Sequence, residues 1–301
     1  MSIIPNIYDI SQKAAWTNHL ETEGYVVIKD ILNDEEYNKA MNLFKKDWNQ
    51  VSPNFDFEDK ETWTINNTPM MFCKGMAVFN GFGQSDFMWY LRTNKKIQSI
   101  FSNIHNTDEL VVSLDGFSVF VSDKQKSKPW LHVDQNPKNP IYCVQGSYNF
   151  FPVEEDGAGF VVVPKSHKEY IPEVSHSKNW IMCEEENLIQ NSKKLLIPGN
   201  CFTVWNSKCI HANEGMKRKG NHFNRLTTYI SYLPKDIRSQ DILEEKIKAY
   251  LNSETTSHWS NKCEIKKYPW GFKKNYENKG FGHIKPKIED NKIPDERYIL
   301  L

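Results

Sequence analysis

The first third of the chain carries apolar residues at the spacing of amphipathic helices. Asn33 and Glu36 have the spacing of a capping box, which marks the start of a helix. Ser85 is a candidate cap for a second helical run. The apolar positions of the two runs are Tyr37, Met41, Phe44 and Trp48, and then Ile97, Ile100, Phe101 and Ile104. We expect both runs to pack on a core through these faces.

From residue 111 onwards the pattern becomes that of β-strands. Short segments rich in Val, Ile, Phe and Tyr are separated by turn sequences such as Asp156-Gly157 and Pro198-Gly199-Asn200. No clear helical pattern lies between them, which favours an antiparallel sandwich or barrel over a parallel sheet. One more helix is expected at residues 241–251. The expected strands are residues 24–28, 111–121, 141–151, 159–163, 195–197, 201–205 and 225–232.

Two stretches lack a regular pattern. Residues 51–83 are rich in Pro, Gly and Asn, and a long irregular loop in a compact domain is usually functional, so we expect a lid or substrate wall here. Residues 252–301 are rich in Lys and Asn but contain several aromatic residues, which predicts an extension wrapped on the core with its last few residues free. Without a linker or repeat, the chain is expected to form one domain, residues 1–301, with a core at about 20–260 and a C-terminal extension at 261–301.

Composition argues against nucleic-acid-binding, membrane and secreted proteins. The 38 basic and 38 acidic residues give no overall field that would attract nucleic acid or an anionic membrane. Residues 1–16 lack the apolar run of a signal peptide, and no stretch is apolar enough to cross a bilayer. The six cysteines form no Cys-x-x-Cys pair, which favours buried thiols in a reducing compartment. We therefore expect a cytoplasmic protein that binds neither nucleic acid nor membrane.

The candidate chemistry begins at residues 129–137, with the sequence PWLHVDQNP. On an extended strand alternate side chains share a face, so His132 and Asp134 point the same way. A histidine beside a carboxylate supplies two members of the 2-His-1-carboxylate triad, which holds non-haem Fe(II) and leaves coordination positions open. His211, at the far end of the apolar strand that follows Pro198-Gly199-Asn200, is the candidate for the third ligand.

Arg225 is the candidate for binding an anionic co-substrate. It opens an expected strand on which Arg225, Thr227, Tyr229 and Ser231 share a face. An arginine that points into a barrel needs an anionic partner, because an unpaired buried guanidinium is very costly. The planar fork would hold one carboxylate of a dicarboxylate co-substrate through two hydrogen bonds. Arg218, in the polar sequence Lys217-Arg218-Lys219-Gly220, is a rival for this role.

These residues, in this order, resemble the Fe(II)/2-oxoglutarate dioxygenases and, within them, the phytanoyl-CoA dioxygenase-like family. Residues 156–168 (DGAGFVVVPKSHK) are similar to the family's glycine turn, strand and "PGSH" segment, with Lys165 where Gly is usual. Residues 198–205 (PGNCFTVW) are similar to the "GD…F" strand before the distal histidine, with Asn200 where Asp is usual. The interval from His211 to Arg225 is a few residues longer than is usual. Residues 113–116, 143–146 and 256–259 resemble one branch of the family.

The resemblance implies an all-β core with flanking helices, folded as a double-stranded β-helix (a cupin-like jelly roll). His132, Asp134 and His211 would hold Fe(II), and Arg225 would pair with the distal carboxylate of 2-oxoglutarate. With O2, such enzymes oxidise a C–H bond of a small organic substrate and release succinate and CO2. Related halogenases have a small residue in place of Asp134, so its carboxylate favours hydroxylation or another C–H oxidation. A non-catalytic jelly-roll module that binds a ligand or partner in the same cavity is the alternative.

Several more residues are candidates for the pocket. Gln145 and Ser113, with Asp115 as a weaker candidate, are expected near the co-substrate, and Trp130 and Gln135 near the substrate. Ordinary packing or hydrogen bonding is the alternative for each of them. The loops expected to select the substrate are residues 51–83 and 212–224. The histidines that we expect to be structural or on the surface are His167, in the "SH" segment, and His176, His222 and His258.

Overall fold

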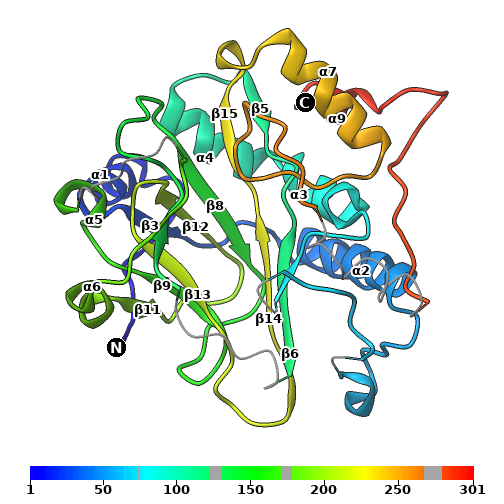
Figure 1. Cartoon of the computed structure of the whole chain (residues 1–301), viewed down its shortest axis with the longest axis horizontal. Coiled ribbons are helices and arrows are strands. Elements are labelled where there is room, and N and C mark those ends of the chain that lie inside the picture. The colour runs from blue at the N-terminus through cyan, green and yellow to red at the C-terminus, as the bar shows by residue number, and fades with distance from the viewer. Residues whose placement is uncertain (65, 73–74, 123–129, 171–177, 268–279) are drawn as a thin grey trace.

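The computed structural model describes residues 1–64, 66–72, 75–122, 130–170, 178–267 and 280–301. Its core consists of two facing sheets, joined by short turns and long loops (Figure 1). The larger sheet has the order β2 (Ile7–Tyr8), β3 (Tyr25–Ile28), β12 (Cys201–Asn206), β8 (Val144–Asn149), β14 (Asn221–Tyr229), β6 (Phe117–Ser122) and β4 (Met76–Ala77). The smaller sheet has the order β1 (Ser2–Ile3), β11 (Lys193–Leu195), β9 (Gly159–Val162), β13 (His211–Glu214), β7 (His132–Val133) and β10 (Ile181–Met182). The predicted jelly roll is confirmed.

Alternation along the strands of the larger sheet creates two separate cores. On β3, Val26 and Ile28 belong to the cluster that packs against the helices, whereas Tyr25 and Val27 belong to the cluster between the sheets. Trp205 of β12 also lies between the sheets. The inner face of β8 is polar, and its polar groups bond across strands: Thr227 donates a hydrogen bond to Asn149 at 3.0 Å. The space between the sheets is therefore lined by polar groups as well as apolar ones.

Helices cover the outer face of the larger sheet (Figure 1). The predicted capping box is present, since Asn33 Oδ1 accepts from the Glu36 N–H and the Glu36 carboxylate accepts from the Asn33 N–H. The second predicted run is two helices, because Asn94 caps a new one after Arg92. The helices are α1 (Lys13–Glu23), α2 (Asp34–Val51), α3 (Asp86–Arg92), α4 (Lys95–His105), α5 (Ser166–Glu169), α6 (Glu186–Asn191), α7 (Gln240–Leu251) and α9 (Asp295–Tyr298), with 3-10 turns η1 (Lys60–Thr62), η2 (Phe82–Gln84) and η4 (Lys235–Ile237).

Two expected strands are each divided in the structure. Residues 111–121 form β5 (Leu110–Val112) and β6, which belong to different sheets, because residues 113–116 break the ladder. Residues 225–232 likewise divide into β14 and β15 (Tyr232–Pro234), and β15 pairs with β5 in a separate ribbon. The expected loop at residues 212–224 is also wrong. Most of it belongs to β13 and β14, which lie in different sheets, so the long interval from His211 to Arg225 contains the crossing from one sheet to the other.

Two departures from the family pattern have a backbone explanation. Lys165 and Asn200 both adopt left-handed conformations, with φ of 66° and 56°. Glycine has no steric penalty in this region and Asn tolerates it better than most residues, so Lys165 is the more strained of the two. The Asn200 amide also uses both of its ends, since Nδ2 donates to the Leu32 carbonyl at 2.7 Å and Oδ1 accepts from the Leu32 N–H at 2.9 Å. An aspartate could not donate the first of these hydrogen bonds.

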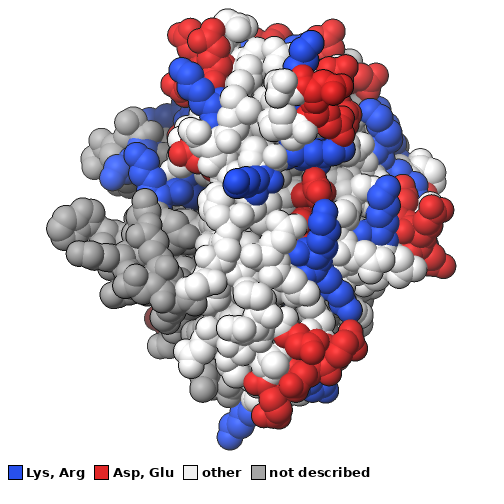
Figure 2. All heavy atoms as spheres, turned by 90° about the vertical axis from the view of Figure 1, so that its right-hand side faces the viewer, with Lys and Arg blue, Asp and Glu red and all other residues white. Residues whose placement is uncertain are grey.

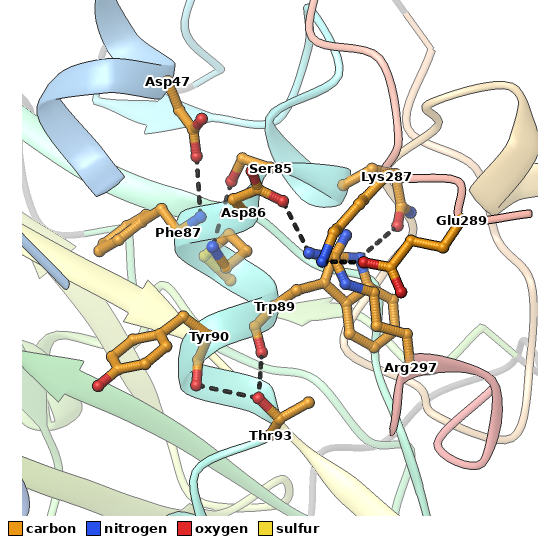
Figure 3. A network of polar contacts seen from close by, with 12 residues as sticks. Asp47, Ser85, Asp86, Phe87, Trp89, Tyr90, Thr93, Lys287, Glu289 and Arg297 are labelled. Atoms are coloured by element: carbon orange, nitrogen blue, oxygen red, sulfur yellow. Dashed lines mark hydrogen bonds and ion pairs between the residues drawn. The ribbon is translucent and has the colours of Figure 1, made fainter. Parts of the chain in front are cut away.

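The C-terminal segment is packed, which corrects the expectation of free last residues. Leu301 is fully buried, and the Leu300 carbonyl accepts from the Val112 N–H at 2.8 Å. Arg297 of α9 pairs with Asp86 of α3, and the adjacent Asp47 of α2 accepts from the Phe87 N–H (Figure 3). We call this group, Asp47, Asp86, Tyr250 and Arg297, the C-terminal clamp. The aromatic residues Tyr268, Trp270 and Phe272 lie outside the described residues.

The surface on the side of the C-terminal segment mixes both charges. Basic and acidic side chains stand next to one another across this face (Figure 2). Such mixing agrees with the balanced composition and provides no continuous basic stripe on this face. Among the described residues, no helix combines the length and apolar character that a membrane crossing requires. Four of the five described cysteines are buried thiols and Cys263 is partly buried, as expected, while Cys73 lies outside the described residues.

Candidate metal centre and active site

His132, Asp134 and His211 come together between the sheets. His132 of β7 and His211 of β13 are direct partners in an antiparallel ladder, so their side chains lie side by side on one face. Asp134 follows β7 and reaches the same point. One ligand atom from each residue lies within 4.8 Å of the other two. The Nε2 atoms of His132 and His211 lie 3.7 and 3.2 Å from the two oxygens of Asp134.

Backbone carbonyls orient both imidazoles. His132 Nδ1 donates to the Trp130 carbonyl at 2.8 Å, and His211 Nδ1 donates to the Cys209 carbonyl at 2.9 Å. In a neutral imidazole the other nitrogen then carries a lone pair. Both Nε2 lone pairs therefore face the oxygens of a carboxylate, an arrangement that becomes favourable when a cation lies between them. Hydrogen bonds of this kind fix the tautomer of metal-binding histidines.

Burial sets the protonation of this group. Burial, with the nearby His211, lowers the pKa of His132 to about 4, so the ring is neutral near pH 7. For Asp134, burial alone would raise the pKa, but the imidazoles of His258, His132 and His211 hold it well below its ordinary value. A neutral imidazole and an ionised carboxylate are the forms that bind a divalent metal. His132 and Asp134 are thus in the forms that bind a cation.

Gln145 positions the carboxylate. Its Nε2 donates to Asp134 Oδ2 at 2.9 Å from β8 in the facing sheet, and the Asp134 N–H donates to the Ser207 carbonyl at 3.0 Å. These two hydrogen bonds fix the Asp134 side chain and backbone relative to the ligand pair. The sequence suggested a co-substrate contact for Gln145. In the structure its described hydrogen bond goes to a candidate metal ligand.

Arg225 is buried without an anionic partner among the described residues. Its side chain is 3 % exposed, and one terminal nitrogen donates to Asn213 Oδ1 at 2.7 Å. Nε and the other terminal nitrogen have no hydrogen-bond partner. Burial lowers the pKa of the guanidinium, but the group keeps its charge near neutral pH. The rival Arg218 is already neutralised on the surface, by Asp156 and Glu154, each at 2.7 Å.

A cavity of about 650 Å³ opens beside the metal group. Asn213 and Tyr229, which surround Arg225, line it together with the three candidate ligands and Gln145. Trp130 lines it too, and its ring stacks on His132 at a centroid distance of 4.4 Å and an angle of 14°. Phe72 and Met76, from the loop expected to form a substrate wall, also reach the cavity. This volume is in the range of small-molecule sites.

Of three other candidates, two lie outside the cavity wall and one is part of it. Gln135 donates to the carbonyls of Asn139 and Ile141, so it stabilises the turn after Asp134 and does not line the cavity. Ser113 accepts from the Ser231 N–H and is equally absent from the cavity wall. Both expectations are corrected, because these side chains bond to local backbone. Asp115, by contrast, lines the cavity.

The histidines outside the metal-binding group fall into two sets, those that bond to backbone carbonyls and one that lines the cavity. His167 bonds to the Glu21 carbonyl and His222 to the Lys219 carbonyl, as expected for structural residues. His176 lies outside the described residues. His258, expected to be structural or on the surface, lines the cavity beside the metal group, and burial lowers its pKa to about 4. Its segment has no periodic pattern, and only the short match at residues 256–259 singled it out.

Two curated proteins resemble the chain in sequence, and no family model matches it. The Ava biosynthesis cluster protein O of Aspergillus versicolor is 24% identical over 257 residues, which span 77% of this chain and 81% of that protein. A Dictyostelium discoideum protein named "Putative phytanoyl-CoA dioxygenase" is 22% identical over 267 residues, or 71% of this chain and 73% of that one.

Solved structures share the fold. The non-heme alpha ketoglutarate dependent epimerase SnoN from nogalamycin biosynthesis superposes with a TM-score of 0.53 at 14% identity, over 74% of this chain and 84% of that one. The carbocyclase SnoK from the same biosynthesis gives a TM-score of 0.51 at 10% identity, over 76% of this chain and 87% of that one. This chain thus has the fold of these iron and 2-oxoglutarate enzymes together with a His-Asp-His metal-binding group. In sequence the chain is thus similar to a putative phytanoyl-CoA dioxygenase, and in fold it is similar to these 2-oxoglutarate enzymes.

Proposed function

We propose that this protein is an Fe(II)- and 2-oxoglutarate-dependent oxygenase that oxidises a C–H bond of a small organic molecule. One observation carries the proposal. The His132–Asp134–His211 group lines the cavity, and the guanidinium of Arg225 is buried next to it, behind the lining residue Asn213, with no anionic partner among the described residues. A divalent cation and a dicarboxylate supply the two missing partners, and together they form the co-substrate complex of this enzyme class.

The residues fit these two ligands. Fe(II) would be held by the Nε2 atoms of the two histidines and by the Asp134 carboxylate, the donor set that suits this metal. 2-Oxoglutarate would bind the metal at one end and place its distal carboxylate on Arg225, between Asn213 and Tyr229. When bound, the metal and 2-oxoglutarate supply the oxidising chemistry with O2, and succinate and CO2 are the expected co-products.

Residues of the chain position the three metal ligands and shield them from water. The Trp130 and Cys209 carbonyls fix the two imidazoles, and Gln145 fixes the carboxylate, so the three ligand atoms are preorganised. The indole of Trp130, stacked on His132, covers one side of the ligand group with an apolar surface. Such shielding limits access of water to the reacting centre.

Proteins with this fold catalyse several types of oxidation. The two structural neighbours are named as an epimerase and a carbocyclase, so this fold supports outcomes other than hydroxylation. The carboxylate of Asp134 occupies the position that halogenases leave open, which favours C–H oxidation without halide. A small molecule is the expected partner, and a cytoplasmic location remains a prediction.

The test compares two histidine variants. His132→Ala should abolish succinate formation from 2-oxoglutarate and weaken Fe(II) binding, because it removes a ligand. His167→Ala, the matched control, should leave both unchanged, since among the described residues the His167 imidazole bonds to the Glu21 carbonyl and not to a candidate ligand. Thermal unfolding should show that both variants remain folded. Equal succinate formation in wild type and His132→Ala would reject the proposal. No iron binding and no succinate formation in the wild type would favour the non-catalytic binding module.

A further inference from the structure

The cavity has a second polar centre, beside the candidate metal ligands but made of other residues. It consists of His258 and Lys266, from the segment after α7, and Asp115, from the β5–β6 connection. None of the three belongs to the metal-binding group. All of them line the same cavity. We call these residues the polar pole.

The wall that carries His258 is held rigidly. The Thr256 N–H donates to the Leu114 carbonyl at 2.9 Å, and the Leu114 N–H donates to Thr256 Oγ1 at 3.2 Å. Ser260 Oγ donates to the Ser231 carbonyl at 2.7 Å, and the buried Lys246 donates to the Ser260 carbonyl at 3.1 Å. These hydrogen bonds lie on both sides of His258. The segment that carries its imidazole is therefore fixed in position although it is neither helix nor strand.

The polar pole lacks partners for its donors. His258 Nε2 is buried and has no hydrogen-bond partner in the described part of the chain. Lys266 has no carboxylate oxygen of a described residue within 4 Å, although Asp115 is close enough to be influenced by its charge. Asp115 instead accepts from the Gly116 N–H at 2.7 Å. Buried polar atoms without partners are costly, and at a cavity wall a ligand can supply the partner.

The mouth of the same cavity is aromatic. Trp180 is 45% exposed and Phe72 is 40% exposed, and both line the cavity. Lys266 Nζ lies 6.0 Å from the centre of the Phe72 ring, so the cation stands next to this apolar rim. Exposed large apolar side chains grouped at a cavity mark a ligand surface. Aromatic faces favour flat, delocalised ligands because such ligands stack well on them.

We propose that the substrate is a flat aromatic anion, with its rings against Trp180 and Phe72 and its anionic group on Lys266 and His258. This inference rests on the proposed function for the statement that the bound molecule is the substrate. The anionic oxygens accept hydrogen bonds from Lys266 and His258, and so supply the partners that these two donors of the polar pole lack. A carboxylate and a phosphate share this chemistry. Lys262, in the same wall, is already paired with Glu264 at 3.4 Å and contributes less.

The test uses matched aromatic probes. Benzene, naphthalene and anthracene derivatives, each as carboxylate, phosphate monoester and neutral amide, are titrated into the protein with saturating Fe(II) and 2-oxoglutarate under anaerobic conditions. Quenching of tryptophan fluorescence reports binding, since Trp130, Trp180 and Trp259 line the cavity. At least one anion is expected to bind about tenfold more tightly than its amide, with the tighter anion identifying the group. If no anion binds more tightly than its amide, the inference is wrong.

Variants locate the anion. Lys266→Met should remove the discrimination between anion and amide, Lys266→Arg should keep it, and the control Lys262→Met should keep it as well. Retention in Lys266→Met, or equal loss in Lys266→Met and Lys262→Met, would overturn the assignment to Lys266. The two proposals fail separately. Binding of Fe(II) and 2-oxoglutarate without anion discrimination overturns only the substrate class, and discrimination without that binding overturns only the oxygenase.

Discussion

Two buried arginines show how this fold treats the same charged group in different ways. Arg297, in the C-terminal clamp, donates to Asp86 at 2.7 Å and to Tyr250 at 3.2 Å, and its plane lies near Trp89 (Figure 3). Arg225, between the sheets, is equally buried but donates to the neutral amide of Asn213, and two of its nitrogens have no partner. In the C-terminal clamp, Asp86 is the anion that pairs with Arg297. Arg225 can instead pair with an anionic ligand that binds next to it.

The largest expected effect comes from removing Arg225, the arginine without an anionic partner among the described residues. Arg225→Met should raise the Kd for 2-oxoglutarate about 100-fold or more, because losing one member of a buried charge pair costs on the order of 3 kcal/mol. It should also leave the ligand-free protein at least as stable as the wild type, because a buried charge without an anionic partner is lost. Calorimetry and thermal unfolding measure the two effects. An unchanged Kd would contradict the role of Arg225.

Removing Arg297, the arginine of the C-terminal clamp, should lower stability and leave co-substrate binding unchanged. Arg297→Met leaves the partly buried Asp86 paired with the more distant and more exposed Lys46, at 3.4 Å. The free energy of unfolding should fall by about 1–3 kcal/mol, discounted because the Asp86 side chain is 32% exposed. The Kd for 2-oxoglutarate should not change. Urea denaturation provides the measurement. A shift in co-substrate affinity of the size expected for Arg225→Met would show that the two regions are coupled.

A smaller effect is expected at the metal group. Gln145→Leu removes the hydrogen bond to Asp134 while leaving all three ligands, and should weaken Fe(II) affinity about 10-fold. Competition with a metal-binding dye checks this. Gln135→Leu serves as the control, since Gln135 bonds to loop carbonyls and not to a ligand. Equal loss of iron in both variants would indicate a general structural effect.

The smallest expected effect is a pH dependence in the clamp. Burial raises the pKa of Asp47 from 3.8 to about 6, so the folded state binds a proton more tightly than the unfolded state. Stability from this group is present below pH 3.8 and is lost as the pH rises towards 6. Asp47→Asn keeps an acceptor for the Phe87 N–H and should raise the free energy of unfolding at pH 7 by about 1–2 kcal/mol. Denaturation at several pH values would show a flatter profile, and an unchanged profile would contradict this account.

The sequence was sufficient for the central strands β3, β8, β9 and β12 and for the residues brought together at the metal group. Alternation identified the shared face of His132 and Asp134, and the apolar strand β12 led to His211. Strand breaks were harder to predict. Val111 to Val121 is nearly continuous in β-forming residues, and only the pairing with β15 and β14 shows where the chain changes sheets.

The polar pole was largely beyond prediction. His258 and Lys266 lie on a wall without periodicity, and contacts distant in sequence fix that wall in place. The partial exposure of residues 221–224 explains the wrong loop at 212–224, since the first half of β14 is polar. Gln135 and Ser113 have polar side chains like Gln145, and only the three-dimensional structure separates those that bond to backbone from the one that reaches Asp134.

The most direct measurement is an anaerobic optical titration with Fe(II) and 2-oxoglutarate. If the metal group and Arg225 hold the two ligands together, a metal-to-ligand charge-transfer band should appear with both present, and with neither alone. The band should require a far higher 2-oxoglutarate concentration in Arg225→Met and should be lost in His132→Ala. No band in the wild type at saturating ligand, or an identical band in His132→Ala, would contradict the central claim.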